Sequence, residues 1–519
     1  MSDDDMKVIE YATFYNIKNP KSKGLKKFID KLSTVNYQTK ENIRYGYFFD
    51  DDKKELRIPR GVGREEIIDT FDIEEDIIES GGYIKNHDDI KFDMVHDPYP
   101  RQRKTINKVI DSFKNDSETQ AIIDMPTGTG KSYSGVYVNH KVEKSALIFT
   151  FETQLAKQWK DNYIEHTDID PDTVYIIQGS NDIASMIEEG HKYNVFITTH
   201  ASVRSFLNRF DMKMFNKFLV NASISLKIYD EFDRESFNMF NIDLHTSVPY
   251  NLYLSATPYR SSKWDDNAFQ YAFNDTFQIG IDFFKDVTPN RKAKFIFYYS
   301  TPSKKEEKKC YNWRFNHRWL KNNSLDKFKK QFDNHMYGIY LLGMDEDDYN
   351  PKKSFINAIE EPINEIKESM GEDSERKHII CTGRIDNCPK MKKLLVSKFG
   401  FKESDIGIYN SDIDDKEKEE ALKRPVILSL SNSIGRGFDL DKLYLILDFE
   451  AYGSKSIFTQ LIGRLARHGG IEGRYYKIID LSFKNTYFYY KSIKKELDGS
   501  FKDVDYEKIE DKIKDRLKD

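Results

Sequence analysis

Residues 125–132 read MPTGTGKS, and this stretch decides the fold of the first half of the chain. An apolar run, 121–123, leads into it, and a stretch compatible with a helix follows. A strand, a glycine-containing loop and a helix in this order form a phosphate-binding loop, or Walker A motif, although Met125 stands where a small residue is usual. The glycines let backbone N–H groups approach a phosphate, and the helix N-terminus adds a favourable dipole. The residues predicted to hold the nucleotide here are Thr127, Gly128, Thr129, Gly130, Lys131 and Ser132.

A second part of the nucleotide site is predicted about 100 residues later, in SLKIYDEFD (225–233). Leu226, Ile228 and Tyr229 suit a buried strand, and Asp230 and Glu231 follow at its carboxyl end, where open α/β sheets bind ligands. Asp230 is predicted to hold Mg²⁺ together with the hydroxyl of Ser132. Glu231 is predicted to orient and polarise the attacking water, because phosphoryl transfer depends mainly on positioning and charge compensation.

A third apolar strand, in NLYLSATPYR (251–260), ends in Ser255-Ala256-Thr257. The order of Walker A, DExD and SAT resembles that of superfamily 2 helicases and translocases, and the resemblance extends from Gln102 to Arg467. It implies two tandem RecA-like domains, ATP and Mg²⁺ as cofactors, and a coupling role for Ser255 and Thr257. By this resemblance, Gln102, 29 residues before Lys131, is the adenine-reading glutamine.

The second RecA-like domain is expected from three further motifs. KHIICTGRIDNC (377–388) resembles motif IV, and VILSLSNSIGRGFDL (426–440) resembles motif V, with Gly437 and Asp439 at the nucleotide. QLIGRLAR (460–467) matches the motif VI pattern QxxGRxxR. Arg464 and Arg467 are three residues apart and therefore share one face of a helix. The resemblance implies that these arginines stabilise the transition-state charge and that Gln460 orders the attacking water.

Several positions favour a DNA-directed branch of the superfamily. Position 85 is Lys where DEAD-box RNA helicases place an aromatic residue, and motif Ia reads TFETQLAKQW (150–159). Motif VI opens with Gln460 where that group has His. The segments KSIFTQLIGRLARHG (455–469) and IPRG (58–61) look most like the UvsW-type helicases of tailed bacteriophages. Asp233 departs from this pattern, since many DNA-directed members have His there, and an RNA-directed activity stays open.

The same resemblance implies residues that grip the nucleic-acid backbone. Short hydroxyls, amides and backbone N–H groups position phosphates without reading bases. The residues are Thr153 and Gln154 of motif Ia, Gln178, Gly179, Thr198 and Thr199 in the first domain, and Thr382, Gly383, Ser431 and Asn432 in the second. Threonine and serine at strand ends are also common caps and turn formers. Basic residues and aromatics alternate over 304–330, which suits either phosphate attraction and stacking or an amphipathic helix.

The motifs divide the chain into four parts. A small α+β N-terminal accessory domain is expected over 1–95, where Arg44, Arg57, Arg60 and Arg64 either contact DNA or form a solvated face. The first RecA-like domain is expected over 96–275. The second is expected over 276–485, with a helical insertion at about 303–370, and a helical tail over 486–519.

Composition narrows the class of protein. The net charge is −5, from 81 basic and 86 acidic residues, so nucleic-acid binding depends on local charge segregation. No run of 18 apolar residues predicts a transmembrane helix, and MSDDDMK is too acidic for a signal peptide. Three cysteines without a CxxC motif predict a reduced, cytoplasmic protein without structural zinc.

The sequence thus predicts an ATP-dependent DNA helicase or double-stranded DNA translocase that remodels branched or annealed DNA, of the phage replication or recombination type. It is expected to be a monomer that binds DNA without sequence specificity, works with replication or recombination proteins, and has no membrane partner. An RNA helicase or transcription-release factor and the motor subunit of a restriction system are the enzymatic alternatives. A degenerate scaffold is disfavoured because Lys131, Glu231 and Arg467 are all present.

Overall fold

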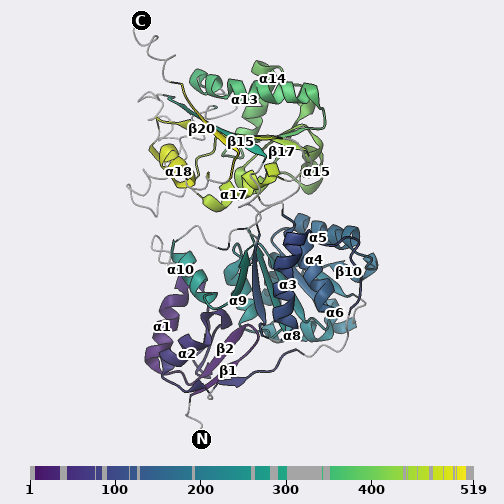
Figure 1. The fold of residues 1–519 in the computed structure, drawn as a ribbon, viewed down its shortest axis with the longest axis vertical. Helices are drawn as coiled ribbons and strands as arrows, with labels where there is room; N and C mark the ends of the chain where they lie inside the picture. The colour runs from purple at the N-terminus through teal and green to yellow at the C-terminus, as the bar shows by residue number, and fades with distance from the viewer. Residues whose placement is uncertain are drawn as a thin grey trace. The chain divides into compact units, whose positions relative to one another are not determined.

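The computed structural model forms two compact units, Met1–Phe283 and Phe284–Asp519 (Figure 1). The first contains a small N-terminal sheet and a large parallel sheet, and the second contains another large parallel sheet. The residues that the structure describes are 6–34, 44–75, 78–84, 90–115, 117–125, 129–189, 193–256, 258, 263–280, 290–300, 342, 351–435, 440, 442–452, 454–466, 472–482, 484–494, 497 and 500–509.

The large sheet of the first unit has seven parallel strands in the order β10-β11-β9-β12-β13-β8-β14. Fully parallel sheets are covered on both faces, which explains the continuous apolar runs read in the sequence. The strands are β8 (Gln120–Asp124), β9 (Ala146–Thr150), β10 (Val174–Ile176), β11 (Val195–Thr199), β12 (Leu226–Asp230), β13 (Tyr250–Ser255) and β14 (Phe277–Gly280).

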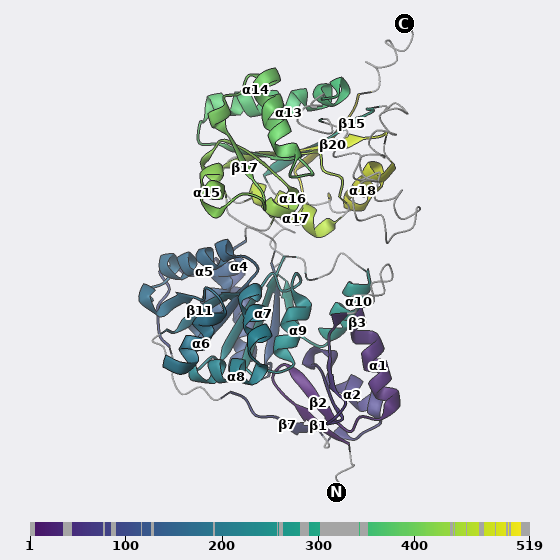
Figure 2. The same ribbon diagram turned by 180° about the vertical axis from the view of Figure 1, so that it is seen from behind.

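Alternate residues of these strands enter two different cores. Ala121 and Ile123 pack with the helices of one face, whereas Ile122 packs with those of the other. Figures 1 and 2 show these two helix layers from opposite sides. One layer contains α3 (Pro100–Lys114), α4 (Lys131–Val142) and α5 (Thr153–His166). The other contains α6 (Ser180–Glu189), α7 (His200–Arg209), α8 (Met212–Asn221) and α9 (Ser236–Asp243).

The N-terminal sheet has the order β5-β6-β2-β1-β7 and is antiparallel except for the β1–β7 pair. It packs on the first parallel sheet through one shared apolar core and through Thr13, whose hydroxyl donates to the carbonyls of Asp243 and Thr246. Its elements are β1 (Lys7–Glu10), β2 (Phe14–Lys18), α1 (Ser22–Leu32), β5 (Phe48–Asp50), β6 (Glu55–Pro59), α2 (Arg64–Phe71) and β7 (Ile78–Ser80). The IPRG segment packs closely against residues 272–276. A Cβ on Gly61 would clash with the Thr276 hydroxyl and the Ala272 carbonyl, so only glycine fits.

The interior of the first unit contains a buried ion pair. The carboxylate of Asp243, at the end of α9, accepts hydrogen bonds from the ammonium of Lys227 and from the hydroxyls of Tyr229 (2.6 Å) and Tyr253 (2.8 Å). The Lys227 side chain is completely buried, and this burial lowers its pKa although the Asp243 carboxylate opposes the shift. Removing one partner of such a pair leaves an uncompensated charge in the core.

We therefore expect Asp243→Ala to destabilise the first unit by about 3–5 kcal/mol, because Lys227 loses its counter-ion. Urea unfolding followed by tyrosine and tryptophan fluorescence measures the change. Asp161→Ala, on the exposed side of α5, is the matched control and should shift stability by less than about 0.5 kcal/mol. Adding Lys227→Met to Asp243→Ala should recover part of the loss. A loss below about 1 kcal/mol would contradict a structural role for this pair.

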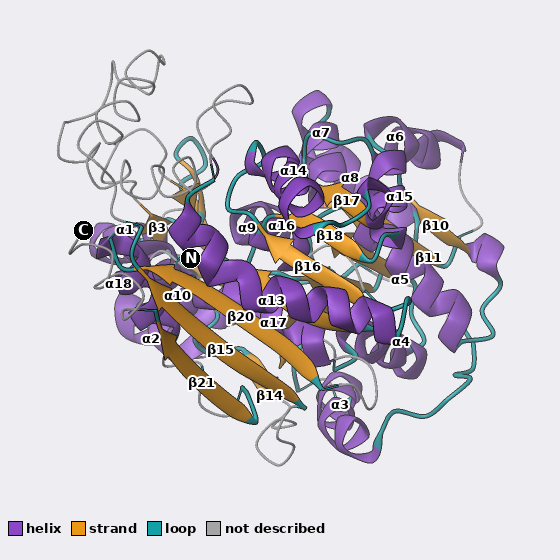
Figure 3. Ribbon diagram, turned by 90° about the horizontal axis from the view of Figure 1, so that it is seen from above, coloured by secondary structure: helices purple, strands orange, loops and turns teal. Residues whose placement is uncertain are grey.

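The second unit contains seven parallel strands in the order β17-β18-β16-β19-β20-β15-β21. The strands are β15 (Arg291–Tyr298), β16 (Lys377–Cys381), β17 (Ile406–Tyr409), β18 (Val426–Ser429), β19 (Leu443–Asp448), β20 (Gly473–Asp480) and β21 (Asp503–Lys508). Two apolar cores again cover the two faces. One holds α13 (Lys353–Glu372), which lies over one face of the sheet (Figure 3), and α14 (Asn387–Phe399). The other holds α15 (Asp415–Lys423), α16 (Ser431–Gly435), α17 (Lys455–Gly463) and α18 (Lys484–Lys494).

These two parallel sheets, each with helices on both faces, confirm the expected tandem RecA-like α/β fold with a small N-terminal α+β sheet. Two edge strands pair differently from what the expected partition implies. Strand β14 lies beyond residue 275 but pairs with β8 in the first sheet. Strand β21 lies within the expected helical tail but pairs with β15. Both are edge strands with partly exposed side chains, so neither has the apolar run of a central strand.

The expected helical insertion at 303–370 is described only in part. Residues 303–341 and 343–350 lie outside the described residues, and so does the basic, aromatic stretch 304–330. Residues 353–372 form α13, whose apolar side packs in the core of the second unit. Of the helices in the described ranges, none is long and apolar enough to cross a membrane.

Candidate functional site

The carboxyl edge of the first sheet brings together the predicted nucleotide residues. Strand β8 ends at Asp124 and α4 begins at Lys131, so the Walker A loop joins them, with Gly130 in the left-handed region (φ +89°). Strand β13 pairs with β8, and β12 pairs with the other side of β13, so the parallel strands bring their carboxyl ends to the same edge as this loop. Thr127 and Gly128 lie outside the described residues.

The ammonium of Lys131 forms an ion pair with the carboxylate of Glu231 across this edge. Both side chains are about 10% exposed, which strengthens their interaction relative to a surface pair. Glu231 has φ +53°, a conformation that non-glycine residues rarely adopt and that turns the chain sharply after β12. Residues in such sparsely populated conformations cluster at functional sites.

Asp230, the last residue of β12, is held by a side chain that sequence reasoning missed. The indole N–H of Trp159, on α5, donates to Asp230 Oδ2 at 2.9 Å. Burial raises the pKa of Asp230, the nearby Lys131 ammonium opposes this shift, and the Glu231 carboxylate adds to it. The partner lies 71 residues away in sequence, so no local spacing rule reveals it. The signal that the sequence does carry is the tryptophan in motif Ia, whose indole N–H is a hydrogen-bond donor.

Gln102 supports the Walker A loop. Its amide N–H donates to the carbonyl of Thr129, and its amide oxygen accepts from the backbone N–H of Tyr99 at 3.1 Å. A Cβ on Gly130 would lie 2.9 Å from the Gln102 amide nitrogen, so glycine permits this close approach. The structure thus gives Gln102 a loop-supporting contact, and its role as an adenine reader stays a prediction.

The SAT segment is linked to the motif II segment. The hydroxyl of Ser255 donates to Asp233 Oδ1 at 2.6 Å, and the backbone N–H of Met125 donates to the Ser255 carbonyl at 2.8 Å. Ser255 therefore connects the Walker A strand with the residue that departs from the motif II pattern of DNA-directed members. Thr257 lies outside the described residues.

The predicted strand contacts of the first unit fall into two groups. Thr153 and Gln154 begin α5, and Gly179 has φ +140° with no atom within 4 Å of a built Cβ, so these positions are accessible. The backbone N–H of Gln178 donates to Asp182 Oδ2 at 2.7 Å. In contrast, the Thr198 side chain is completely buried, and the Thr199 hydroxyl caps α7 by accepting from the N–H of Ser202 at 3.1 Å. In the structure Thr198 lies in the core and Thr199 caps α7, and their role as strand contacts stays a prediction.

In the second unit, motifs IV and V meet at the carboxyl edge of the sheet. The Thr382 side chain is buried, and its hydroxyl donates to the Arg384 carbonyl at 2.9 Å. The backbone N–H groups of Gly383 and Ser431 both donate to Glu450, which follows β19. Sequence reasoning missed Glu450, although the rule that found Asp230 applied: an acidic residue follows the apolar strand LYLILD. Asn432 is exposed, and Gly437 and Asp439 lie outside the described residues.

Motif VI differs in one detail from the expected helix. The α-helix α17 ends at Gly463, and Arg464–Ala466 continues as a 3₁₀ turn. Arg464 and Gln460 are buried, and Arg467 lies outside the described residues.

The four N-terminal arginines, for which the sequence leaves both a DNA contact and a solvated face open, each have a partner within the first unit. The Arg57 guanidinium lies 5.5 Å from the ring centres of both Phe14 and Phe48. Arg60 pairs with Glu10 at 3.2 Å and Arg64 with Glu75 at 3.4 Å, while Arg44 lies over the ring of Phe237. Arg44 is nevertheless exposed and Arg64 partly exposed, and a contact of these arginines with DNA stays a prediction.

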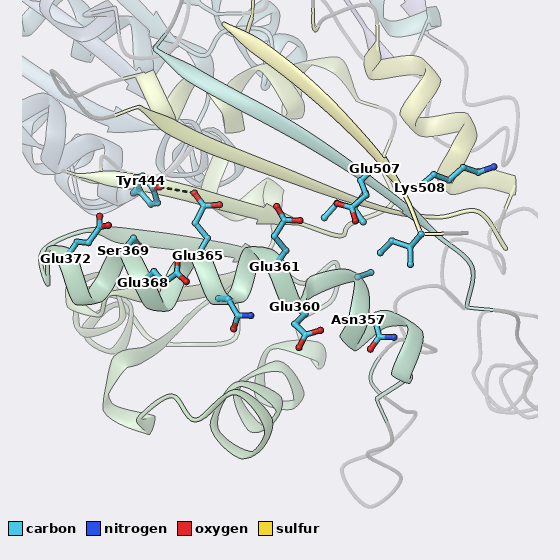
Figure 4. Close-up of a pocket in the computed structure, with 14 residues that line it drawn as sticks. Asn357, Glu360, Glu361, Glu365, Glu368, Ser369, Glu372, Tyr444, Glu507 and Lys508 are labelled. Carbon is cyan, nitrogen blue, oxygen red and sulfur yellow. Dashed lines mark hydrogen bonds between the residues drawn. The ribbon is translucent and has the colours of Figure 1, made fainter. Parts of the chain in front are cut away.

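A cavity of about 770 Å³ lies along α13 in the second unit (Figure 4). Its walls carry Glu360, Glu361, Glu365 and Glu368, and the Tyr444 hydroxyl donates to Glu365 at 2.8 Å. These carboxylates repel phosphate groups, so the cavity suits neither a nucleotide nor a nucleic-acid backbone. The predicted site lies instead at the strand ends.

Comparison with known proteins supports the superfamily 2 resemblance. Residues 96–260 match the family described as type III restriction enzyme, res subunit. A stretch of 133 residues is 25% identical to the general transcription and DNA repair factor IIH helicase/translocase subunit XPB of Schizosaccharomyces pombe. That match covers 25% of this chain and 16% of the relative. The Walker A, DEFD and SAT segments all lie within residues 96–260.

Two solved structures of helicases are also similar to the chain. The Pyrococcus furiosus Hef helicase domain has a TM-score of 0.43 at 13% identity, with 75% of this chain and 99% of that chain covered. The DEAD-box helicase Mss116 bound to ssRNA and UDP-BeF has a TM-score of 0.47 at 16% identity, with 73% of this chain and 69% of that chain covered. The UvsW-type resemblance stays a prediction.

Proposed function

We propose that this chain is an ATP-dependent DNA helicase or double-stranded DNA translocase that remodels branched or annealed strands, of the UvsW-type phage kind. The observation that carries the proposal is the edge of the first sheet, where Lys131 lies against Glu231 and beside Asp230. A lysine at a glycine loop, a metal-binding carboxylate and a water-polarising carboxylate are the groups that ATP hydrolysis requires. Strand contacts in both units would couple this hydrolysis to movement along nucleic acid.

The residues at this edge fit an ATP–Mg²⁺ complex. Magnesium prefers hard oxygen ligands and keeps several waters, so one carboxylate and one hydroxyl suffice. Asp230 and Ser132 supply these groups, and the bound ion would neutralise charge on the β- and γ-phosphates. When nucleotide binds, the Lys131 ammonium would leave Glu231 and contact the phosphate oxygens instead. The Glu231 carboxylate would then be free to orient the attacking water. In this proposal Gln460 assists that water, and Gly437 and Asp439 contact the nucleotide.

The test of the proposal is ATPase activity measured side by side with forked DNA, Holliday junctions, duplex DNA, single-stranded DNA and RNA. The proposal expects the strongest stimulation by branched or duplex DNA, together with strand separation or displacement of a bound blocking protein. Stimulation by RNA alone would favour the RNA helicase or transcription-release alternative. No ATP turnover with any of these substrates would favour a scaffold.

The match of residues 96–260 to the restriction-enzyme res subunit favours one second candidate, a restriction-system motor whose nuclease is on another chain. Purification of the chain from its native source, with a search for a bound nuclease and ATP-dependent DNA cleavage, separates the two candidates. Cleavage by the complex, absent for the isolated chain, would favour the restriction motor.

Trp159→Phe is expected to raise the Mg²⁺ concentration that gives half-maximal ATPase activity by about 10-fold or more. The reason is that partners that orient a metal ligand typically contribute about 10- to 100-fold in metal affinity. Phenylalanine keeps most of the buried ring but cannot donate to Asp230. A Mg²⁺ titration of ATPase activity at fixed ATP measures the shift. Tyr163→Phe, one turn later on α5, is the control, since it removes a hydrogen bond to Asn139 (2.8 Å) instead. Equal Mg²⁺ curves for both variants would reject the positioning role of Trp159.

A further inference from the structure

The ends of three adjacent strands in the second unit meet at one carboxylate. Glu450 follows β19, Gly383 follows β16 and Ser431 follows β18, and these strands are neighbours in the sheet. Glu450 Oε1 accepts from the N–H of Gly383 at 3.2 Å and from the N–H of Ser431 at 2.7 Å. Glu450 Oε2 accepts from the Ser431 hydroxyl. The carboxylate thus joins the two motifs that are predicted to grip the nucleic-acid backbone.

The backbone of Glu450 is fixed independently of these contacts. The Lys477 ammonium donates to the Glu450 carbonyl at 2.7 Å and to Asp448 Oδ2 at 2.8 Å, while the Glu450 N–H donates to Asp448 Oδ1 at 2.9 Å. The hydroxyls of Tyr452 and Tyr475 also donate to Asp448. Because Glu450 is partly exposed, its side chain can rotate toward solvent without moving this network.

The donors at Glu450 are those that a phosphate would need. Each backbone N–H has one hydrogen, and those of Gly383 and Ser431 are both directed at Glu450. An arriving phosphate therefore meets occupied donors and a negative charge of its own sign. Gly383 has φ +74°, a left-handed backbone conformation that favours glycine and that directs its N–H toward Glu450.

We propose that Glu450 is an internal competitor of the nucleic-acid backbone: its carboxylate occupies the strand-binding donors of motifs IV and V and must turn away before a phosphate binds them. This inference rests on the proposed function, which assigns Gly383 and Ser431 to the strand. Glu450 thereby lowers the affinity of the second unit for nucleic acid. Partial burial, with the neighbouring Asp448 carboxylate as the second cause, raises the pKa of Glu450 to about 7.

The test compares Glu450→Gln and Glu450→Ala with the unaltered chain, by fluorescence anisotropy of labelled oligo(dT) without nucleotide. If Glu450 occupies these donors in about 90% of the molecules, only about 10% are competent to bind. Removing its carboxylate then lowers the apparent Kd for oligo(dT) about 10-fold. We expect the alanine variant to bind most tightly and the glutamine variant to lie between, because a neutral amide oxygen is the weaker acceptor. The glutamine variant keeps the shape of the side chain and serves if the alanine variant does not fold, as judged by thermal unfolding.

Glu365→Gln on α13 is the matched control, because it removes one charge from the same unit at a carboxylate held by the hydroxyls of Tyr444 and Tyr476. Its affinity should stay within about twofold of the unaltered chain, because the Glu365 carboxylate is held by Tyr444, Tyr476 and Arg474 and not by the donors of motifs IV and V. Unchanged or weaker binding by the Glu450 variants would overturn the competitor role and indicate that Glu450 organises the loops. If Glu365→Gln tightens binding as much as the Glu450 variants do, the gain comes from the loss of any negative charge, and the competitor role of Glu450 is rejected. If the unaltered chain binds no nucleic acid, the proposed function itself fails.

Discussion

Replacing Lys131 by alanine is expected to reduce ATP hydrolysis by at least about 10²–10³-fold, because one preorganised charge at the reacting phosphate is lost. The structure adds a second reason. The Lys131 ammonium lowers the pKa of both Asp124 and Asp230, and burial raises both, that of Asp124 to about 6. Without Lys131 both pKa values rise further, so Asp230 becomes a weaker ligand for Mg²⁺. Hydrolysis is measured by phosphate release with and without DNA.

The fold is expected to survive this substitution, since Lys131 lies at the sheet edge and contributes no side chain to the apolar cores. Thermal unfolding of the variant should show a transition within a few degrees of the unaltered chain, which corresponds to about 1 kcal/mol. Lys141→Ala, near the other end of α4, is the control for loss of a lysine from the same helix and should keep full activity. Turnover retained by a folded Lys131→Ala protein would remove the nucleotide site from this position.

The fold was largely predictable because its central strands are short apolar runs that end in chemically distinctive residues. Strands β8, β12, β13, β16 and β18 each precede a motif, so the pattern and the motif support each other. The edge strands β14 and β21 were missed because one side of an edge strand has no neighbour. Their exposed residues remove the apolar signal, and only the pairing with β8 and β15 defines them.

The candidate site was predictable in its residues but not in their partners. Lys131, Asp230 and Glu231 follow from sequence motifs, and the structure brings them to one edge. The hydrogen bonds to Trp159 and Glu450 join residues far apart in the chain, and no periodicity encodes such contacts. Thr198 shows the opposite case: its residue type suits a phosphate contact, yet its strand buries it completely.

Arg467→Ala is expected to leave ATP binding nearly unchanged and to slow hydrolysis by about 10³–10⁵-fold, the contribution of an arginine that stabilises the transferring phosphoryl group. The physical reason is that charge on the γ-phosphate oxygens develops in the transition state, so a guanidinium that acts there affects kcat far more than binding. In the proposed mechanism Arg464 and Arg467 both serve this purpose, and α17 with its 3₁₀ turn sets the position of Arg464.

Two measurements separate this role from a loss of fold or of nucleotide binding. Binding of a fluorescent ATP analogue should give nearly the same Kd for Arg467→Ala as for the unaltered chain, while single-turnover hydrolysis falls by orders of magnitude. Arg376→Ala is the matched control, because Arg376 pairs with Glu372 at 2.6 Å on α13 and lies over the ring of Tyr444. An unchanged kcat for Arg467→Ala would reject the transition-state role. A large rise in the Kd for nucleotide, with kcat preserved, would instead make Arg467 a residue that binds ground-state ATP, because uniform binding affects affinity without accelerating the chemical step.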